Sequence, residues 1–393
     1  MPMERKTKIF VMTTIPITAR NFCIPIADIL VRNGAEVVFG FSDGKEAIDI
    51  KNLGYRIKTV PISRNPFSIK NLLGIFLLAS FLRRERFDII ETTTPVASVV
   101  GRIAAILAGV PIRINTIRGT FPEDTHRWQA ALFYTSERIL ARFTTFTITI
   151  NREDMEELIT RGLVEKKKIM SVSGGGCGID LQKFDINLYP RERRLSLRKE
   201  LGLNEDDYVI TYLGRLCTDK GIFDFIELIK CLAEDTSNIK GLIVGEPLQG
   251  EKYAIRQDEI RGLAQSLDIG DRIVLTGFRE DVPALIAVTN VVVLPSKREG
   301  FGLILAEAAA MGKPAVAYSC RGTREAIEDG LTGYLIEQGN VGGMKDAISR
   351  LINNRVMEQE ISKNAYSRAR DHFDKKILID EYERVYMKFL NRN

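Results

Sequence analysis

Four charged residues in the second half of the chain have the types and spacing to hold an elongated anionic ligand. Glu299 and Glu307 stand eight residues apart in the segment EGFGLILAE. On one continuous helix they would be about 12 Å apart, at about 1.5 Å per residue. This is wider than the roughly 5–9.5 Å between the two carboxylates of a glycosidase. We therefore expect the glutamates to bind two ends of one ligand and not to act as an acid/base pair.

Two cations accompany the glutamates. Arg215 and Lys220 belong to the segment GRLCTDKG, which follows an apolar strand pattern at 208–213. Arg215 offers a planar fork of donors and Lys220 a compact point charge, and both suit phosphate oxygens. A solvated surface is the simpler interpretation of any one of these charges. Their shared position after the strands of one predicted sheet favours a ligand site.

The elements expected around these residues would form an anion site. Residues 291–294 are wholly apolar, which is typical of a central parallel strand buried on both faces. A polar loop follows, and then an alanine-rich helix that ends before Gly312. A helix N-terminus after such a loop presents unpaired N–H groups and the positive end of the helix dipole.

The whole chain alternates strand and helix patterns, which predicts two doubly wound parallel-sheet (Rossmann-like) α/β domains. Ligands of such sheets bind at the carboxyl ends of the strands, so two domains would face each other across a cleft. We expect an N-terminal, acceptor-side domain at 1–185, a charged linker at 186–205 and a donor-binding domain at 206–370. Residues 371–393 are expected to form an amphipathic helix that packs back on the first domain.

Composition limits the chemistry. The 393 residues are 45% hydrophobic and 27% charged, with a net charge of +5, as in an ordinary soluble protein. Five scattered cysteines without a C-x-x-C pair argue for a reducing compartment and against disulfides or zinc. Only His126 and His372 are available as bases or metal ligands. The basic residues lack the interleaved aromatics of nucleic-acid binders, so we expect no nucleic-acid partner.

One apolar segment has two interpretations. Residues 72–82 (LLGIFLLASFL) are too short to span a bilayer, and basic residues follow as far as Arg86. The segment from Leu72 onward is either a buried helix of the sheet domain or a helix that lies on an anionic membrane surface. The N-terminus enters a strand directly, without the apolar core of a signal peptide. We therefore expect a cytoplasmic protein, which is either free in the cytoplasm or associated with the inner face of the membrane.

Several long segments resemble the retaining glycosyltransferases of family 4. In the second half these are GRLCTDKG, GFREDVPALIAVTNVVVLPSKREGFGLILAEAAAMGKPAVA and RGTREAIEDGLTGYLI. In the first half TTIPITARNF, ETTTPVASVVGRIAAILAGVPIRINTIRG and TINREDMEEL are also similar. The resemblance covers nearly the whole chain and is closest to the subgroup that builds lipid-linked and capsular polysaccharides. It implies the GT-B fold, in which a C-terminal helix crosses back to the first domain.

The resemblance assigns roles to the charged residues. Arg215 and Lys220 would grip the pyrophosphate of a nucleotide-sugar donor and stabilise the departing phosphate. Glu299 would contact hydroxyls of the transferred sugar, and Glu307 the ribose hydroxyls. Loop residues would complete the donor site, with backbone amides toward the sugar or β-phosphate and one aromatic–arginine pair beside the base. These donor-binding residues are Gly214, Gly300, Phe301, Gly302, Phe278 and Arg279.

The first half departs from the resemblance. Relatives usually carry histidines where this chain reads ETTTP at 91–95, and one more where it has Arg118. Arg118 either keeps a donor near the phosphates and adds a permanent charge, or marks a changed or lost activity. On the acceptor side we single out Thr18, Arg20 and Thr94. A loop charge and a helix N-cap are the simpler interpretations of Arg20 and Thr18.

The function implied is transfer of a hexose or N-acetylhexosamine from a nucleotide-diphosphate sugar, with UDP preferred, to a lipid-linked or polysaccharide acceptor. Fixed cations and helix amides can stabilise a departing diphosphate without a metal, and no D-x-D motif is present. We therefore expect no metal and no cofactor beyond the donor. A non-catalytic subunit that binds nucleotide-sugars or scaffolds a polysaccharide complex is the alternative. A nucleotide-sugar 2-epimerase is a further one, but it would need more acid/base groups.

Overall fold

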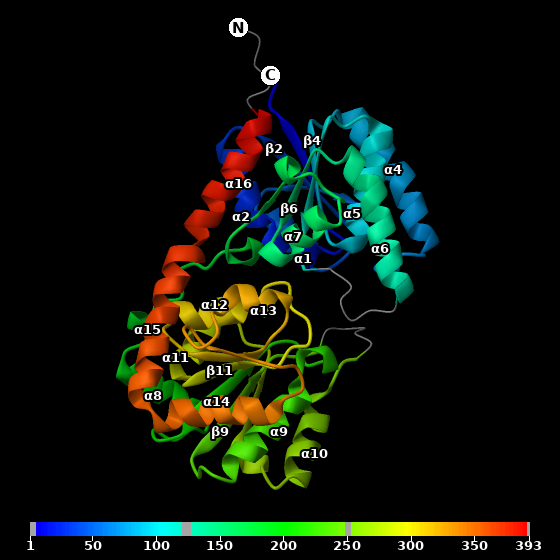
Figure 1. Cartoon of the computed structure of the whole chain (residues 1–393). Coiled ribbons are helices and arrows are strands. Elements are labelled where there is room, and N and C mark those ends of the chain that lie inside the picture. Colours follow the sequence, from blue (N-terminus) through cyan, green and yellow to red (C-terminus); the bar gives the residue numbers. More distant parts are fainter. Residues whose placement is uncertain (1–4, 120–126, 248–252, 391–393) are drawn as a thin grey trace. The chain divides into compact units, whose positions relative to one another are not determined.

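The computed structural model describes residues 5–119, 127–247 and 253–390 (Figure 1). The chain divides into two compact units. The first consists of residues 1–177 together with 376–393, and the second of residues 178–375.

The first unit is built on a parallel sheet of seven strands in the order β3-β2-β1-β4-β5-β6-β7. The strand order reverses between β1 and β4, which lie side by side although β2 and β3 come between them in the chain. Central strands are buried along nearly their whole length, as expected from their apolar sequences. The bounds are β1 Lys8–Met12, β2 Glu36–Phe41, β3 Arg56–Thr59, β4 Ile89–Thr93, β5 Ile112–Ile117, β6 Phe146–Thr149 and β7 Ile169–Ser171.

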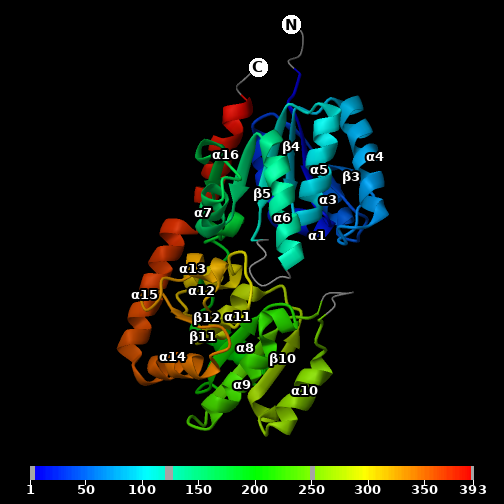
Figure 2. The same ribbon diagram turned by 45° about the vertical axis from the view of Figure 1, so that its right-hand side comes forward.

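Helices cover the sheet of the first unit, with α4, α5 and α6 on one side of it (Figure 2). Proline begins α5 at its first position, and Gly109 ends it with a φ of 73°. An asparagine side chain caps α7. The bounds are α1 Pro16–Phe22, α2 Ile24–Arg32, α3 Ala47–Asn52, α4 Ile69–Glu85, α5 Pro95–Ala108, α6 Arg127–Leu140, α7 Arg152–Thr160 and α16 Lys375–Leu390.

The second unit has a parallel sheet of six strands in the order β10-β9-β8-β11-β12-β13, with its reversal between β8 and β11. Its strands are β8 Tyr208–Leu213, β9 Ile239–Val244, β10 Ile273–Gly277, β11 Val291–Leu294, β12 Ala315–Tyr318 and β13 Tyr334–Ile336. Its helices are α8 Arg191–Glu200, α9 Ile222–Ala233, α10 Gln257–Ser266, α11 Val282–Val288, α12 Leu303–Ala310, α13 Arg321–Ala326, α14 Val341–Asn353 and α15 Arg355–His372. Two doubly wound parallel sheets are thus confirmed.

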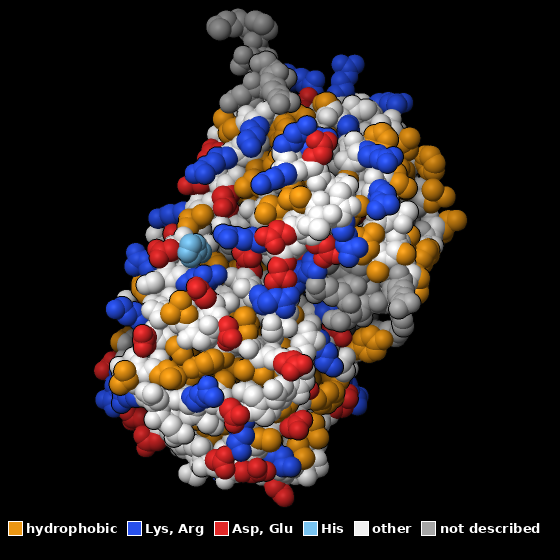
Figure 3. Space-filling model, in the orientation of Figure 1, with side chains coloured by type: hydrophobic (Ala, Val, Ile, Leu, Met, Phe, Trp, Pro, Cys, Tyr) orange, Lys and Arg blue, Asp and Glu red, His pale blue; other side chains and the backbone are white. Residues whose placement is uncertain are grey.

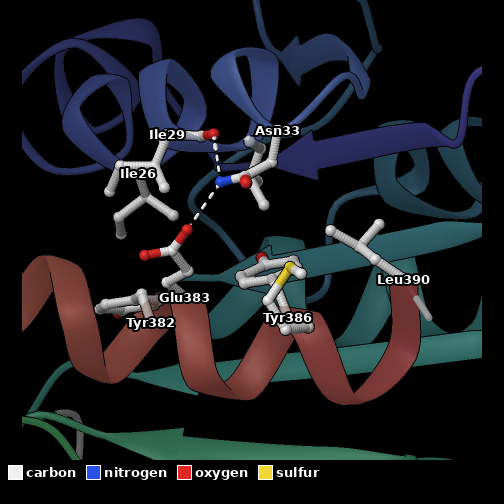
Figure 4. Close-up of a pocket in the computed structure, with 9 residues that line it drawn as sticks. Ile26, Ile29, Asn33, Tyr382, Glu383, Tyr386 and Leu390 are labelled. Atoms are coloured by element: carbon white, nitrogen blue, oxygen red, sulfur yellow. Dashed lines mark hydrogen bonds between the residues drawn. The ribbon is translucent and has the colours of Figure 1, made fainter.

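The C-terminal helix α16 belongs to the first unit. Tyr382 and Tyr386 are buried there, and the Tyr386 hydroxyl donates a hydrogen bond to the buried carboxylate of Glu91. Figure 4 shows α16 against α2, where the Asn33 side chain donates to the backbone oxygen of Ile29 (3.1 Å) and to Glu383 (2.9 Å). The chain therefore leaves the first unit after residue 177 and returns to it at residue 376.

Residues 186–205, expected to be a linker, lie within the second unit. They contain a 3-10 helix at Ile186–Leu188 and the helix α8. Arg198 on α8 donates to the backbone oxygen of Val288 (2.9 Å) at the end of α11 and to that of Asp207 (2.9 Å) before β8. These bonds attach the charged helix to the sheet domain, so its composition reflects a solvated face and not a flexible connection.

Candidate functional site

The candidate site of the second unit lies where its strand order reverses. β8 and β11 are neighbours, with Val291 paired to Ile210 and Val292 to Thr211. Because both strands run the same way, the loops that follow them leave the same edge of the sheet. The first loop carries Arg215 and Lys220, and the second carries Glu299. Open parallel sheets bind ligands at such a position.

Lys220 and Glu299 are in direct contact. The Lys220 Nζ lies 2.5 Å from Glu299 Oε1, and the two side chains are only 16% and 14% exposed. Asp219 ties the same two loops together, because its backbone oxygen accepts from the Lys297 N–H (3.0 Å) and its carboxylate binds Arg298 (2.6 Å). The cation and the carboxylate are thus held in place before any ligand binds.

Two glycines allow the Glu299 loop to be clamped from both sides. Gly221 begins α9 with a φ of +71°, and a Cβ there would lie 1.9 Å from the Pro295 oxygen. A Cβ on Gly322, in α13, would lie 2.4 Å from the Phe301 nitrogen. No side chain fits at either position. The loop is therefore fixed between the first turns of two helices.

The residues after Glu299 present backbone and not side chains. Phe301 is buried, and its ring packs edge-on against Phe373 at 5.3 Å between centroids. Gly302 caps α12 with a φ of +77°. The first N–H groups of a helix have no partner within it, so the start of α12 offers donors and the positive end of its dipole. The side chain of Phe301 anchors this turn.

Glu307 lies one turn before the end of α12 and is partly buried. Burial raises the pKa of its carboxyl group to about 7, and the positive charge of Lys183 opposes this shift. Within the described residues, no hydrogen bond or ion pair engages the carboxyl group. A partly buried acceptor of this kind suits a ligand that brings hydroxyl donors.

The other donor-side residues have different surroundings. The Arg215 side chain is exposed, whereas its backbone oxygen accepts from the Tyr212 hydroxyl at 2.7 Å. Gly214 lies close to the next loop, since a Cβ on Gly245 would be 1.9 Å from the Gly214 oxygen. The loop that bears Arg215 therefore has a fixed backbone and a side chain that reaches solvent.

Phe278 and Arg279, the pair expected beside the nucleotide base, differ in their surroundings, because only Arg279 has ion-pair partners. Phe278 is 67% exposed. The guanidinium of Arg279 binds Asp281 at 2.7 Å and Glu200 at 3.1 Å, and these hydrogen bonds raise its pKa. The contact with Glu200, from α8, could not be predicted from the sequence, because the two residues are 79 positions apart. A role for this pair toward a nucleotide base stays a prediction.

In the first unit, Arg118 follows β5 and its guanidinium is buried. Nη1 donates to the Gly176 oxygen at 3.2 Å, and the group lies 5.0 Å from the centroid of the Phe22 ring. Among the described residues, its Nε and Nη2 groups have no partner. Burial raises the pKa of neighbouring Cys23 to about 12, with Arg118 opposing, so the thiol is neutral beside it. Two unpaired cationic N–H groups suit an anionic ligand.

Thr94 lies where the strand order of the first sheet reverses. Its φ of +73° is rare for a β-branched residue, and such conformations concentrate at functional positions. Its hydroxyl lies 2.6 Å from that of Thr14, which follows β1. Thr18 and Arg20, expected in a loop, lie instead within α1, because Pro16 begins a helix there. Arg20 pairs with Asp49 at 3.3 Å on the surface.

Glu91 is a residue that sequence reasoning did not single out. It is 1% exposed, and its carboxylate accepts hydrogen bonds from Thr116 (2.7 Å) and from Tyr386. A charged residue inside an apolar strand was the available signal. Its partner Tyr386 is 295 residues away in the chain, so no sequence signal could reveal that the two residues pair.

Two features are absent from the part of the chain that the structure describes. Among the described residues, no group of three or more His, Cys, Asp or Glu side chains is arranged to hold a metal ion. His126 lies outside the described residues. In the same part of the chain, every helix falls short of the length and apolar character that a bilayer crossing requires.

Comparison with known proteins places both halves in related families. Residues 194–368 match the model of the glycosyl transferases group 1, and residues 25–175 that of the glycosyl transferase 4-like domain. The capsular polysaccharide biosynthesis glycosyltransferase CapM of Staphylococcus aureus is 28% identical over 367 residues, which is 93% of each chain. The UDP-Gal:alpha-D-GlcNAc-diphosphoundecaprenol alpha-1,3-galactosyltransferase of Escherichia coli is 29% identical over 83% of this chain and 82% of its own.

Solved structures share the fold. The complex of Anabaena Alr3699/HepE with UDP and glucose has a TM-score of 0.80 and 22% identity, over 97% of this chain and all of that one. The sucrose-phosphate synthase of Thermosynechococcus elongatus also has a TM-score of 0.80, with 18% identity over 99% of this chain and all of its own. At these identities the likeness establishes the architecture alone.

Proposed function

We infer that this chain, which belongs to the glycosyltransferases with a 4-like domain followed by a group 1 domain, moves a hexose or N-acetylhexosamine from a UDP-sugar to a lipid-linked or polysaccharide acceptor. We propose that it does so with retention of configuration and without a metal ion. The names of the Staphylococcus and Escherichia coli relatives support the acceptor class. The galactosyltransferase name and the HepE complex support UDP.

The contact between Lys220 and Glu299 is the observation on which this proposal chiefly rests. In the proposed reaction the bond from the sugar C1 to the diphosphate breaks, and negative charge grows on the departing phosphate. Lys220 and Arg215 stabilise that charge, with the first amides of α12. Glu299 orients hydroxyls of the sugar and holds Lys220 in place while the site is empty. Their partial burial strengthens both effects, because water screens the charges less.

The acceptor oxygen attacks C1 from the side that the diphosphate leaves, which retains the configuration. The acceptor hydroxyl proton passes to the departing phosphate oxygen, so that atoms and charge balance without a protein base. Glu307 accepts hydrogen bonds from the ribose hydroxyls. Arg118 keeps its two unpaired N–H groups for an anionic part of a substrate.

We also propose that α4 contacts the membrane that holds a lipid-linked acceptor. The helix buries only the stripe of Asn71, Gly74, Leu78 and Leu82. Its outer face exposes Leu73 (53%) and Phe76 (61%), beside basic side chains near its C-terminus. Figure 3 shows hydrophobic side chains gathered along the edge of the unit that α4 forms. An apolar face flanked by cations suits an anionic leaflet.

A thermal-shift panel of UDP- and GDP-sugars, followed by a hydrolysis assay on the best binder, tests the donor assignment. In this assay Lys220→Ala should lower turnover about 10²–10³-fold with little change in donor affinity, because Lys220 acts on developing charge. Glu307→Ala should instead weaken donor binding about 10–100-fold, through the lost hydrogen bonds to ribose.

Equal, small effects of the two substitutions would contradict the assignment of the site. Tight binding of a nucleotide sugar with neither hydrolysis nor transfer to any acceptor would favour the non-catalytic subunit instead.

A further inference from the structure

A large groove in the first unit is not used by the proposed reaction. It has a volume of about 810 Å³ and lies between α4, α5, α6 and the loop before α4. Its walls are mostly apolar and include Ile75, Val99 and Leu132. We call this feature the tail groove. Its volume falls in the range of roughly 300–1,000 Å³ that is typical of pockets for small ligands.

The tail groove has a polar inner end. Thr94, Ser98 and Thr116 line it there. Thr94 follows β4 at the reversal of the strand order, where doubly wound sheets bind ligands. Close by in the sequence, Thr93 Oγ1 and Asn115 Nδ2 are buried and lack a partner among the described residues. Polar groups therefore concentrate at the end that meets the candidate acceptor side.

The outer end is apolar and open to solvent. Phe67 is 69% exposed, Leu72 53% and Trp128 54%. The rings of Phe67 and Trp128 lie 6.0 Å apart across the mouth. Exposed apolar side chains of this size, gathered around one opening, mark a binding surface.

Hydrogen bonds hold the wall of the groove in shape. Asn71 is 6% exposed, and its side chain donates to the backbone oxygens of Asn65 (2.8 Å) and Pro66 (3.3 Å) and accepts from the Ser63 N–H (2.8 Å). A Cβ on Gly74 would lie 2.9 Å from the Pro61 oxygen, so α4 sits directly on this loop. The groove is thus formed before any ligand enters.

We propose that the tail groove binds the hydrocarbon chain of a prenyl-diphosphate-linked acceptor, next to its headgroup. This inference rests on the proposed function. An occupant that connects a polar strand-end site to an apolar mouth must itself have a polar head and a long apolar tail. Arg64, in the loop before α4, lines the groove, and Lys70 lies in the first turn of α4. Glu137 also lines the groove, but its carboxylate is paired with Arg102, so the balance of charge favours an anionic partner. A second copy of this chain, with its net charge of +5, fits less well.

The single tryptophan of the chain allows a direct test. Trp128 lines the groove, so its fluorescence should respond to a ligand there. We expect geranylgeranyl diphosphate, kept below its micelle concentration, to shift the emission to shorter wavelength in a saturable manner. Inorganic diphosphate at the same concentration should leave the emission unchanged.

Leu72 and Leu73 form a matched pair for the same titration. Both are 53% exposed on α4, but only Leu72 lines the groove. Leu72→Asp should weaken binding of the prenyl diphosphate at least about tenfold, because a charge would be placed against the chain. Leu73→Asp should bind within about twofold of the unchanged protein.

Equal affinities of the two variants for the prenyl diphosphate, or no emission shift in the unchanged protein, would contradict the proposal that the tail groove binds a hydrocarbon chain. Neither result touches the donor assignment, since nucleotide-sugar binding and hydrolysis are measured without a lipid. Conversely, binding of the prenyl diphosphate that depends on Leu72, without binding of any nucleotide sugar, would support the tail-groove proposal and contradict the proposed transferase activity.

Discussion

Glu307 combines burial with the absence of a partner among the described residues, and this sets a pH dependence. Its pKa of about 7 lies above the ordinary value of 4.5, so near neutrality half of the molecules hold a neutral acid. The ionised form is the better acceptor for ribose hydroxyls. Donor affinity should therefore rise about tenfold between about pH 6 and pH 8, as the competent form becomes fully populated. Titration calorimetry with the best UDP-sugar across this range measures the effect.

Glu307→Gln is the control, because its amide does not titrate. Its donor affinity should be flat over the same range, and a slope like that of the unchanged protein would refute the assignment. Without ligand the sign for stability is opposite. Because the pKa of Glu307 is higher in the folded than in the unfolded state, the protonated carboxyl group contributes to folding stability. This contribution is present in full below about pH 4.5 and is lost as the pH rises through about 7. Relative to Glu307→Gln, the unchanged protein should therefore lose stability over that interval.

The residues of the candidate donor site could be proposed from the sequence, whereas the contacts between them could not. The glutamates and cations of the two segments were identified from residue type and spacing, and Lys220 and Glu299 do lie together. Their pairing depends on the backbone at Gly221 and on the close approach of Gly322, which are tertiary features. Thr18 and Arg20 lie in the short helix α1 and not in the expected loop, because one proline is too weak a signal to reveal that helix.

At the scale of elements, α4 should control binding to membranes. Leu73→Asp combined with Leu77→Asp should reduce partition to phosphatidylglycerol vesicles about tenfold or more, because both side chains are exposed on its apolar face. Leu331→Asp, at an exposed leucine of the second unit, is the control and should leave partition unchanged. Co-sedimentation at low and high salt provides the measurement. If none of the three substitutions changed the fraction of protein that co-sediments with vesicles, the proposal that α4 contacts the membrane would be contradicted.

Elements were predicted well where their pattern is local and poorly where it is not. Strands such as β8 and β11 are short and largely apolar, and Gly214 and Pro295 follow them directly, so their positions could be predicted from the sequence. The pattern at 72–82 left a buried and a surface helix open, and α4 is in fact buried along one stripe and exposed along another. The segment 186–205 resembled a linker because α8 is highly charged, and only its contacts show that it belongs to a domain.

At the scale of the whole molecule, α16 completes the first unit. Tyr386→Phe removes one of the two hydrogen bonds to the buried Glu91 carboxylate. It should lower the free energy of unfolding of the first unit by about 1–3 kcal/mol. Tyr382→Phe, one turn away, is the matched control, because its buried hydroxyl lacks a partner among the described residues. Its effect should stay within about 0.5 kcal/mol.

Calorimetry with and without nucleotide sugar should separate the unfolding of the two units, since the donor stabilises only the second. If Tyr382→Phe cost as much as Tyr386→Phe, the contact with Glu91 would not be what holds α16.

The second unit is inserted into the first, and this imposes an order on synthesis. During synthesis, all seven strands of the first sheet leave the ribosome long before Tyr386 does. The Glu91 carboxylate therefore lacks its hydrogen bond from Tyr386 until the last part of the chain has been made. Residues 178–375 emerge in one piece and can fold as soon as they are free. The first unit therefore completes its fold only after the whole of the second unit has been made.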